Sequence, residues 1–100
     1  MSLKPLEFGP LAIREVRAAR KWYEDISPDL ASRFVQAFRK ALDRIESSAE
    51  ACPPYFHGTR FAKVGRFPYV IVFFEFEDKL VVIAVAHVRR KPGYSRKRKS

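Results

Sequence analysis

Two segments in the first half of the chain repeat apolar residues at the spacing of an amphipathic helix. The first begins at Pro10 and carries apolar residues at every third or fourth position, namely Ala12, Val16, Ala19, Tyr23 and Ile26. The second repeats this stripe and fades near Ser47 and Ser48, with Leu30, Phe34, Ala37, Phe38, Ala41, Leu42 and Ile45. Because such a stripe faces the core while the other side stays polar, the pattern predicts two helices with one buried face each.

A break of three residues, Ser27-Pro28-Asp29, separates the two stripes. Ser27 can cap the second helix, Pro28 suits its first position, and Asp29 complements the positive end of the helix dipole. Pro10 suits the start of the first helix in the same way. So short a connection predicts an antiparallel helical hairpin.

After a Pro-rich loop at residues 49–58, the apolar spacing changes from helical to alternating. Aromatic and β-branched residues gather in segments that are separated by turns. Including one short segment before the first helix, strands are predicted at residues 6–8, 60–64, 67–76 and 80–88. The last two strands are apolar at both parities, which predicts a central position with both faces covered. The predicted fold class is α+β: a short N-terminal strand, then an αα-hairpin packed on an antiparallel sheet, in the order β-αα-βββ.

The net charge of +9 lies almost entirely at the C-terminal end of the chain. Seven of the 20 Lys and Arg residues follow His87, so the 13 before it nearly balance the 11 acidic residues. A basic segment of this kind attracts polyanions such as nucleic acid or an acidic peptide. We expect one domain over residues 1–92 and a basic tail at residues 93–100.

A single cysteine, Cys52, excludes an internal disulfide and is typical of a reducing compartment. The N-terminus lacks the apolar core of a signal peptide, and no apolar run is long enough to span a bilayer. We therefore expect a cytoplasmic protein that does not bind membranes. His57 lies in the Pro-rich loop without further ligands at metal-binding spacing, so neither a metal nor a cofactor is expected.

Several short sequences that follow one another from residue 6 to residue 92 resemble the RelE/ParE toxin superfamily, and within it the ParE-like plasmid stabilisation toxins. The most telling pair is Phe67-Pro68-Tyr69 at a strand start and His87-Val88-Arg89-Arg90-Lys91-Pro92 at a strand end. The other matching pieces are Trp22-Tyr23-Glu24, Ser27-Pro28-Asp29-Leu30-Ala31, Arg33-Phe34, Pro53 and Arg60.

This resemblance implies the toxin of a bacterial type II toxin–antitoxin system, with a cognate antitoxin that wraps the toxin through an acidic, partly disordered segment. Toxins of the superfamily act in one of two ways. ParE-like toxins poison DNA gyrase by binding, whereas RelE-like toxins cleave mRNA on the ribosome. The two expected targets are therefore DNA gyrase and the ribosome with its mRNA.

Cleavage of RNA without a metal needs a general base, a general acid and cations on the phosphate. His87 and Tyr94 are the catalytic candidates if the chain is a nuclease. RelE-like nucleases resemble one another in carrying an arginine early in the third strand, where this chain has Val70. They also carry a basic pair on the second strand, whereas Arg60 and Lys63 differ in strand parity here. The sequence thus favours binding over enzymatic cleavage.

Basic residues near the strand ends and in the tail are the candidates for function. The candidate residues for contact with the target, the antitoxin or nucleic acid are Arg60, Arg66, Arg89, Arg90, Lys91, Arg96, Lys97 and Arg98. His87 shares the alternation of Val81, Ile83 and Val85, which is also consistent with a half-buried histidine at the sheet edge. Two alternatives to a gyrase poison stay open: a RelE-like ribosome-dependent mRNA endoribonuclease, and a non-toxic nucleic-acid-binding module of the same fold.

Overall fold

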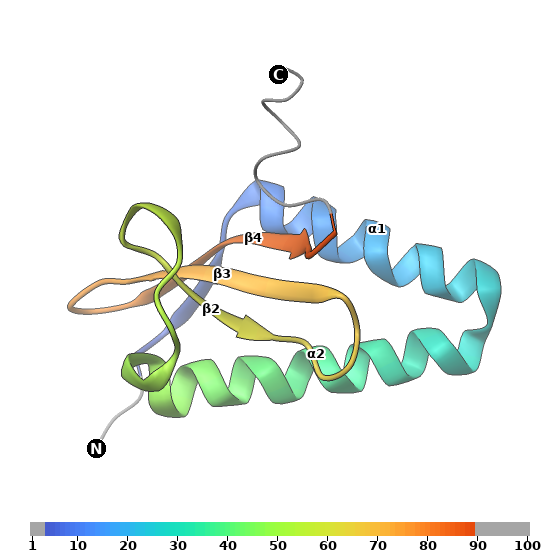
Figure 1. The fold of residues 1–100 in the computed structure, drawn as a ribbon, viewed down its shortest axis with the longest axis horizontal. Helices are drawn as coiled ribbons and strands as arrows, with labels where there is room; N and C mark the ends of the chain where they lie inside the picture. The colour runs from blue at the N-terminus through green and yellow to red at the C-terminus, as the bar shows by residue number, and fades with distance from the viewer. Residues whose placement is uncertain (1–3, 90–100) are drawn as a thin grey trace.

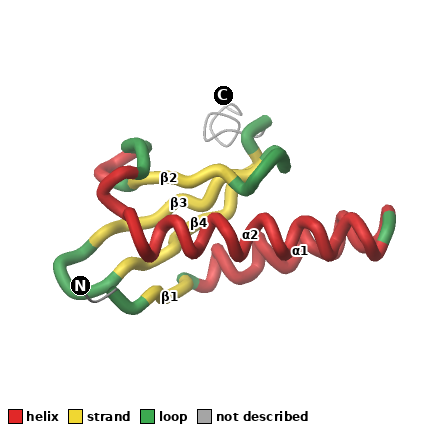
Figure 2. Tube along the Cα trace, turned by 90° about the horizontal axis from the view of Figure 1, so that it is seen from below, coloured by secondary structure: helices red, strands yellow, loops and turns green. Residues whose placement is uncertain are grey.

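The structure, a computed structural model, describes residues 4–89 and has two layers, a helical hairpin and a four-stranded sheet (Figures 1 and 2). Both helices lie on the same face of the sheet (Figure 2). In chain order the elements are β1 (Leu6–Phe8), α1 (Pro10–Ile26), α2 (Pro28–Ser48), the short 3₁₀ turns η1 (Ala49–Ala51) and η2 (Phe56–Gly58), β2 (Arg60–Lys63), β3 (Tyr69–Glu75) and β4 (Leu80–His87). This order confirms the predicted β-αα-βββ arrangement.

One residue, Ser27, both ends α1 and begins α2. Its backbone N–H donates to the Tyr23 carbonyl at 2.8 Å, while its hydroxyl oxygen accepts from the Leu30 N–H at 3.4 Å. Its extended backbone turns the chain between the helices, and Pro28 takes the first position of α2. The predicted hairpin and its cap are therefore confirmed.

The sheet has the order β1-β4-β3-β2, with β3 and β4 at its centre as predicted. β3 is antiparallel to both of its neighbours, β2 and β4, but β1 pairs parallel with β4 through Leu6 and Leu80, so the sheet is mixed. A parallel pair needs a long crossover, and the helical hairpin with β2 and β3 supplies it. β1 has only three residues, and their alternating burial fits a parallel and an antiparallel pairing equally well. The sequence therefore could not predict the direction of β1.

An extra residue in β4 changes which side chains face the helices. The register passes from Val72↔Ala84 to Phe73↔Val82, which leaves Ile83 without a partner in β3. Such a bulge shifts the alternation by one position. As a result His87 lies on the same face as Val85 and Val82, and the expectation that it alternates in step with Val81 is wrong.

The core lies between the hairpin and this inner face of the sheet. Its centre is a cluster of rings from both layers: Tyr23 lies 5.3 Å from Phe34 and 5.0 Å from Phe67, and Tyr69 lies 5.7 Å from Phe34, measured between ring centroids. Phe34 is fully buried, and burial of such a side chain stabilises the fold by about 1.5–3 kcal/mol.

The opposite face of the sheet lies away from α1 and α2 and, within residues 4–89, is covered only in part. Val70 and Val72 are buried there, but Phe74, Ala84 and Ala86 stay partly exposed. The expectation that both faces of the central strands are covered is thus met on one face only. Within the described residues, no helix is both long and apolar enough to cross a membrane.

Burial raises the pKa of the Tyr23 phenol above its ordinary value of 10.0, and the neighbouring Tyr69 raises it further. The folded chain therefore holds this proton more tightly than the unfolded chain does. The resulting stability is fully present below pH 10 and is lost as the pH rises through the raised pKa. We predict that Tyr23→Phe flattens the fall in the free energy of unfolding between pH 9 and pH 11, as measured by urea denaturation.

The matched control for this measurement is Tyr55→Phe, which removes a phenol from the loop outside the core cluster. It shows whether the loss of any phenol, and not only of the buried one, changes the pH dependence. An equally steep decline in the Tyr23→Phe protein would show that the Tyr23 phenol does not couple folding to pH.

Candidate functional site

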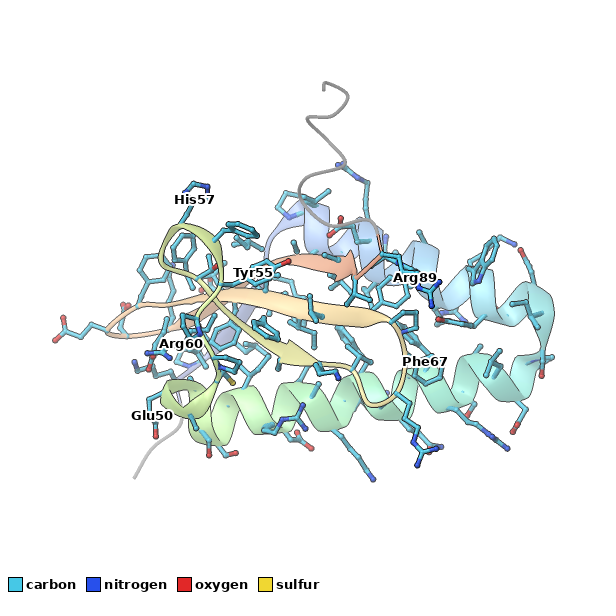
Figure 3. The ribbon with its side chains drawn as sticks, viewed as in Figure 1. Glu50, Tyr55, His57, Arg60, Phe67 and Arg89 are labelled. Atoms are coloured by element: carbon cyan, nitrogen blue, oxygen red, sulfur yellow. The ribbon has the colours of Figure 1, made fainter. Side chains whose placement is uncertain are left out.

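Three cations gather at one end of the sheet. Because neighbouring strands are antiparallel, the end of β2, the start of β3 and the end of β4 lie together, as the pairs Lys63↔Val70 and Tyr69↔His87 show. Lys63, Arg66 and Arg89 are exposed here, and Figure 3 shows Arg89 at the end of β4. Among residues 4–89 none of these three cations has an ion-pair partner. We call this group the cationic end.

Arg60, another predicted binding residue, lies at the opposite end of the sheet beside Glu50 (Figure 3). Its guanidinium donates to the Cys52 carbonyl at 2.7 Å and to the Glu50 carbonyl at 3.3 Å, and its Nε lies 3.5 Å from a Glu75 carboxylate oxygen. Glu75 is paired on its other oxygen with Lys4 at 3.3 Å. Arg60 therefore fastens the loop before β2 to the sheet, and the structure does not bring it to the cationic end.

His87 is held in place by two contacts beside the cationic end. Its Nδ1 accepts a hydrogen bond from the Arg89 backbone N–H at 3.1 Å, and its ring meets the Tyr69 ring edge-on at 5.0 Å. One ring nitrogen thus supports the backbone at the end of β4. Tyr94, its predicted catalytic partner, lies outside the described residues, as do Arg90, Lys91, Arg96, Lys97 and Arg98.

RelE-like nucleases resemble one another in carrying an arginine early in the third strand, and this chain has Val70 at that position. Val70 is 5% exposed, and β3 consists of apolar and aromatic residues up to Glu75. His87 is the one histidine at this end of the described chain. The described residues here offer positive charge for binding an anion.

The remaining reactive side chains do not form a site. Figure 3 shows His57 at the tip of the loop before β2, pointing away from the molecule. Cys52 is buried, and burial raises the pKa of its thiol, which makes it a poor nucleophile. Within residues 4–89 no three His, Cys, Asp or Glu side chains come together to hold a metal ion.

An open groove of about 1030 Å³ runs along the outer edge of β4. One wall is α1, the floor is the last part of β4 with Val72 and Phe74, and the loop before β2 closes the far end. Its lining is mainly apolar and includes Glu15, Ala18, Trp22, Tyr55, Phe56, Val72, Phe74, Ala84, Ala86 and His87. We call it the α1 groove.

α1 carries three large apolar side chains that are exposed to water, and of these Trp22 lines the groove. Trp22 is 64% exposed, Ile26 is 60% exposed and Leu11 is 46% exposed. Ile26 was predicted to belong to the buried stripe, and that prediction is wrong because the helix extends beyond the sheet at its last turn (Figure 1). Sequence reasoning missed this surface, although its signal was present: Leu11, Ala18, Trp22 and Ile26 repeat at helical spacing beside the buried stripe.

Glu15 is the one acidic residue of the groove lining and was also missed. Its Oε1 accepts a hydrogen bond from the Val85 backbone N–H at 2.7 Å, from the outer edge of β4. β1 covers this edge only from Leu80 to Val82. The carboxylate therefore protects the part of the edge that has no neighbouring strand.

Comparison with known proteins identifies the fold and the family. A model of the family described as the ParE toxin of the type II toxin–antitoxin system, parDE, matches residues 6–92. No functionally curated protein is detectably similar in sequence.

Two solved structures share the fold at low sequence identity. A chain of the chromosomal ParDE TA system from P. aeruginosa superposes with a TM-score of 0.73 at 19% identity, over 85% of this chain and 96% of that one. A chain of the E. coli DinJ-YafQ toxin–antitoxin complex superposes with a TM-score of 0.62 at 12% identity, over 90% and 98%. The family match spans nearly the whole chain and coincides with the described fold, so this protein belongs to the ParE toxin family of type II toxin–antitoxin systems.

Proposed function

We propose that this toxin arrests growth by binding and poisoning DNA gyrase, without cleaving RNA. The observation that carries the proposal is the chemistry of the cationic end. Lys63, Arg66 and Arg89 offer positive charge without ion-pair partners among the described residues. The position early in β3 at which RelE-like nucleases resemble one another in carrying an arginine is occupied here by Val70. Charge of this kind supports binding to an anionic surface, while cleavage would also need a positioned acid and base.

The partner that we propose in the cell is a cognate antitoxin with an acidic, partly disordered segment. The ParE family assignment supports this partner, and the similar P. aeruginosa and E. coli chains come from toxin–antitoxin systems. The basic C-terminal residues of the sequence complement an acidic segment. Neutralisation would follow because the antitoxin covers charge that the target needs.

The mechanism is tested by expressing the toxin alone under tight control. We expect growth arrest accompanied by altered DNA supercoiling and by DNA breaks, with transcripts intact when mRNA ends are mapped at the same times. New transcript ends that appear before any DNA damage would overturn the proposal in favour of the RelE-like nuclease. Normal growth would instead favour the non-toxic nucleic-acid-binding module.

The double variant Arg89→Ala/Arg90→Ala should relieve growth arrest and leave the fold intact. Arg89 is exposed, and both changes remove positive charge that follows β4 in the sequence, so we expect the melting temperature to move by only about 4 °C or less. The measurements are colony counts after induction and a thermal melt of the purified protein.

The control for this variant is Arg39→Ala/Lys40→Ala, which removes the same charge from the exposed side of α2. It should remain as toxic as the parent chain. Equal toxicity of the Arg89→Ala/Arg90→Ala protein would show that the cationic end is not the surface that contacts the target. Equal relief in both double variants would mean that net charge alone matters.

A further inference from the structure

We infer that the toxin contacts the phosphate backbone of the duplex DNA that gyrase holds, through a row of cations that joins α2 to the cationic end. The row consists of Arg44, Lys63 and Arg66, and we call it the cationic ridge. This inference rests on the proposed function and adds a second partner to it, the DNA itself. Three features of the ridge support it: the way it is assembled, its surplus of positive charge, and the kinds of side chain exposed beside it.

Contacts between α2 and the end of β2 bring cations from two distant segments together. A terminal guanidinium nitrogen of Arg44 donates to the Lys63 carbonyl at 2.9 Å. Gly65, in the turn after β2, lies so close to α2 that an added Cβ would be 3.1 Å from the Ala37 Cβ (Figure 1). Ala37 and Arg44 are two turns apart and therefore lie on the same side of α2. Arg66 directly follows the glycine that touches this side of the helix.

The positive charge of the ridge is not neutralised by its neighbours. All three side chains are exposed, and none has an ion-pair partner within residues 4–89. By contrast, Arg33 of α2 is paired with Asp29 at 3.0 Å. The sequence has no acidic residue from position 59 to position 74. The residues three or four positions from Arg44 are also not acidic, namely Lys40, Ala41, Ser47 and Ser48. Such a surplus of charge attracts a polyanion.

The side chains around the ridge suit a duplex better than a single strand. Proteins that bind single strands stack the bases on exposed aromatic rings beside the positive charge. The large apolar side chains that are exposed in the described part of the chain lie on α1, in η2, and after β3 and β4. None of them belongs to α2, to β2 or to the turn between β2 and β3. The ridge therefore offers charge and hydrogen-bond donors, which suit the phosphates on the outside of a duplex.

A contact with DNA would contribute directly to the poisoning of gyrase. A ligand shifts an equilibrium only when it binds one state more tightly than the other. A toxin that traps gyrase on its DNA must therefore bind the DNA-loaded enzyme more tightly than the free enzyme. Cations that touch the DNA backbone supply this difference, because the phosphates are present only in the loaded state.

Binding of a labelled duplex of about 20 base pairs to the purified full-length toxin tests the contact without gyrase. Fluorescence anisotropy would give the affinity at salt concentrations from about 50 to about 200 mM. Each cation that neutralises a phosphate adds about 0.9 to the steepness of log K against log salt. Arg44→Gln/Lys63→Gln/Arg66→Gln should lower this steepness by about 2.7, so the parent should lose about 40-fold more affinity than the variant over this range. Lys63→Gln/Arg66→Gln, which keeps the Arg44 side chain, should lower it by about 1.8.

The matched control is Arg14→Gln/Arg17→Gln/Arg39→Gln, which removes the same charge from outside the ridge. All three arginines are exposed and have no ion-pair partner among the described residues. Arg39 precedes Arg44 by five positions, which places it about 140° away around the axis of α2. This control should show the same salt dependence as the parent.

A second measurement compares the affinity of the toxin for free gyrase with its affinity for gyrase loaded with duplex DNA. We expect the parent to bind the loaded enzyme at least about tenfold more tightly, as a contact worth about 1.4 kcal/mol would give. This gain should shrink in the triple ridge variant and persist in the control. A toxin that binds neither form of gyrase would refute the gyrase proposal, whereas the salt dependence of DNA binding is measured without gyrase.

Three results would overturn the inference: the parent's salt dependence in the triple ridge variant, an equal loss in the control, or tighter binding of a single strand than of the duplex. The second would mean that net charge, and not the ridge, holds the DNA. The third would make an unpaired strand of DNA or RNA the ligand of this surface.

Discussion

The contact on which the rest of the structure depends is the packing of Tyr23 between α2 and the sheet. Its ring lies against Phe34 of α2 and Phe67 before β3, and 6.4 Å from Tyr69 of β3, so one side chain joins both layers. Side chains project from a helix at fixed angles to one another, so the packing of Tyr23 sets the rotation of α1 about its own axis. With Tyr23 facing inward, Trp22 must point toward the edge of the sheet, where it forms the wall of the α1 groove.

The same packing reaches the other surface of interest through Tyr69. The Tyr69 ring packs edge-on against His87, and His87 in turn accepts a hydrogen bond from the Arg89 N–H at the end of β4. The position of Arg89 therefore depends on the aromatic core, although Arg89 itself is exposed. A substitution in the ring cluster that removes a ring would therefore disturb the α1 groove and the cationic end together.

Local patterns predicted the elements of this fold because the forces behind them act over short distances. The Ser27-Pro28-Asp29 break specifies one cap and one turn, and the order of helices and strands followed from apolar periodicity. The direction of β1 and the extra residue at Ile83 depend on pairing between distant segments, and neither was predicted from the sequence. That single extra residue was enough to move His87 to the inner face, because alternation has a period of two.

Prediction of the site was limited for a related physical reason: charge in the sequence does not reveal which charges are already engaged. Arg60 and Arg66 look equivalent in a strand-and-turn pattern, but Arg60 is held by two carbonyls and Glu75, whereas Arg66 is exposed. Glu15 is the opposite case, a charge that looks unengaged in the sequence. Its role became evident only from the structure, in which its carboxylate accepts a hydrogen bond from β4. Partners distant in sequence decided both outcomes.

The positions of the two surfaces suggest how one antitoxin could restrain the toxin. The α1 groove ends at His87, two residues before Arg89, so the groove and the cationic end are continuous along the last turn of the chain that the structure describes. A partner that covered both surfaces would gain affinity from buried apolar area, which salt hardly weakens, and from acidic residues that reach the cations. Anchoring at the groove raises the effective concentration of those acidic residues beside Arg89. An antitoxin bound in this way would shield the exposed charge of the cationic end. An isolated acidic peptide would bind these cations only weakly at cellular salt.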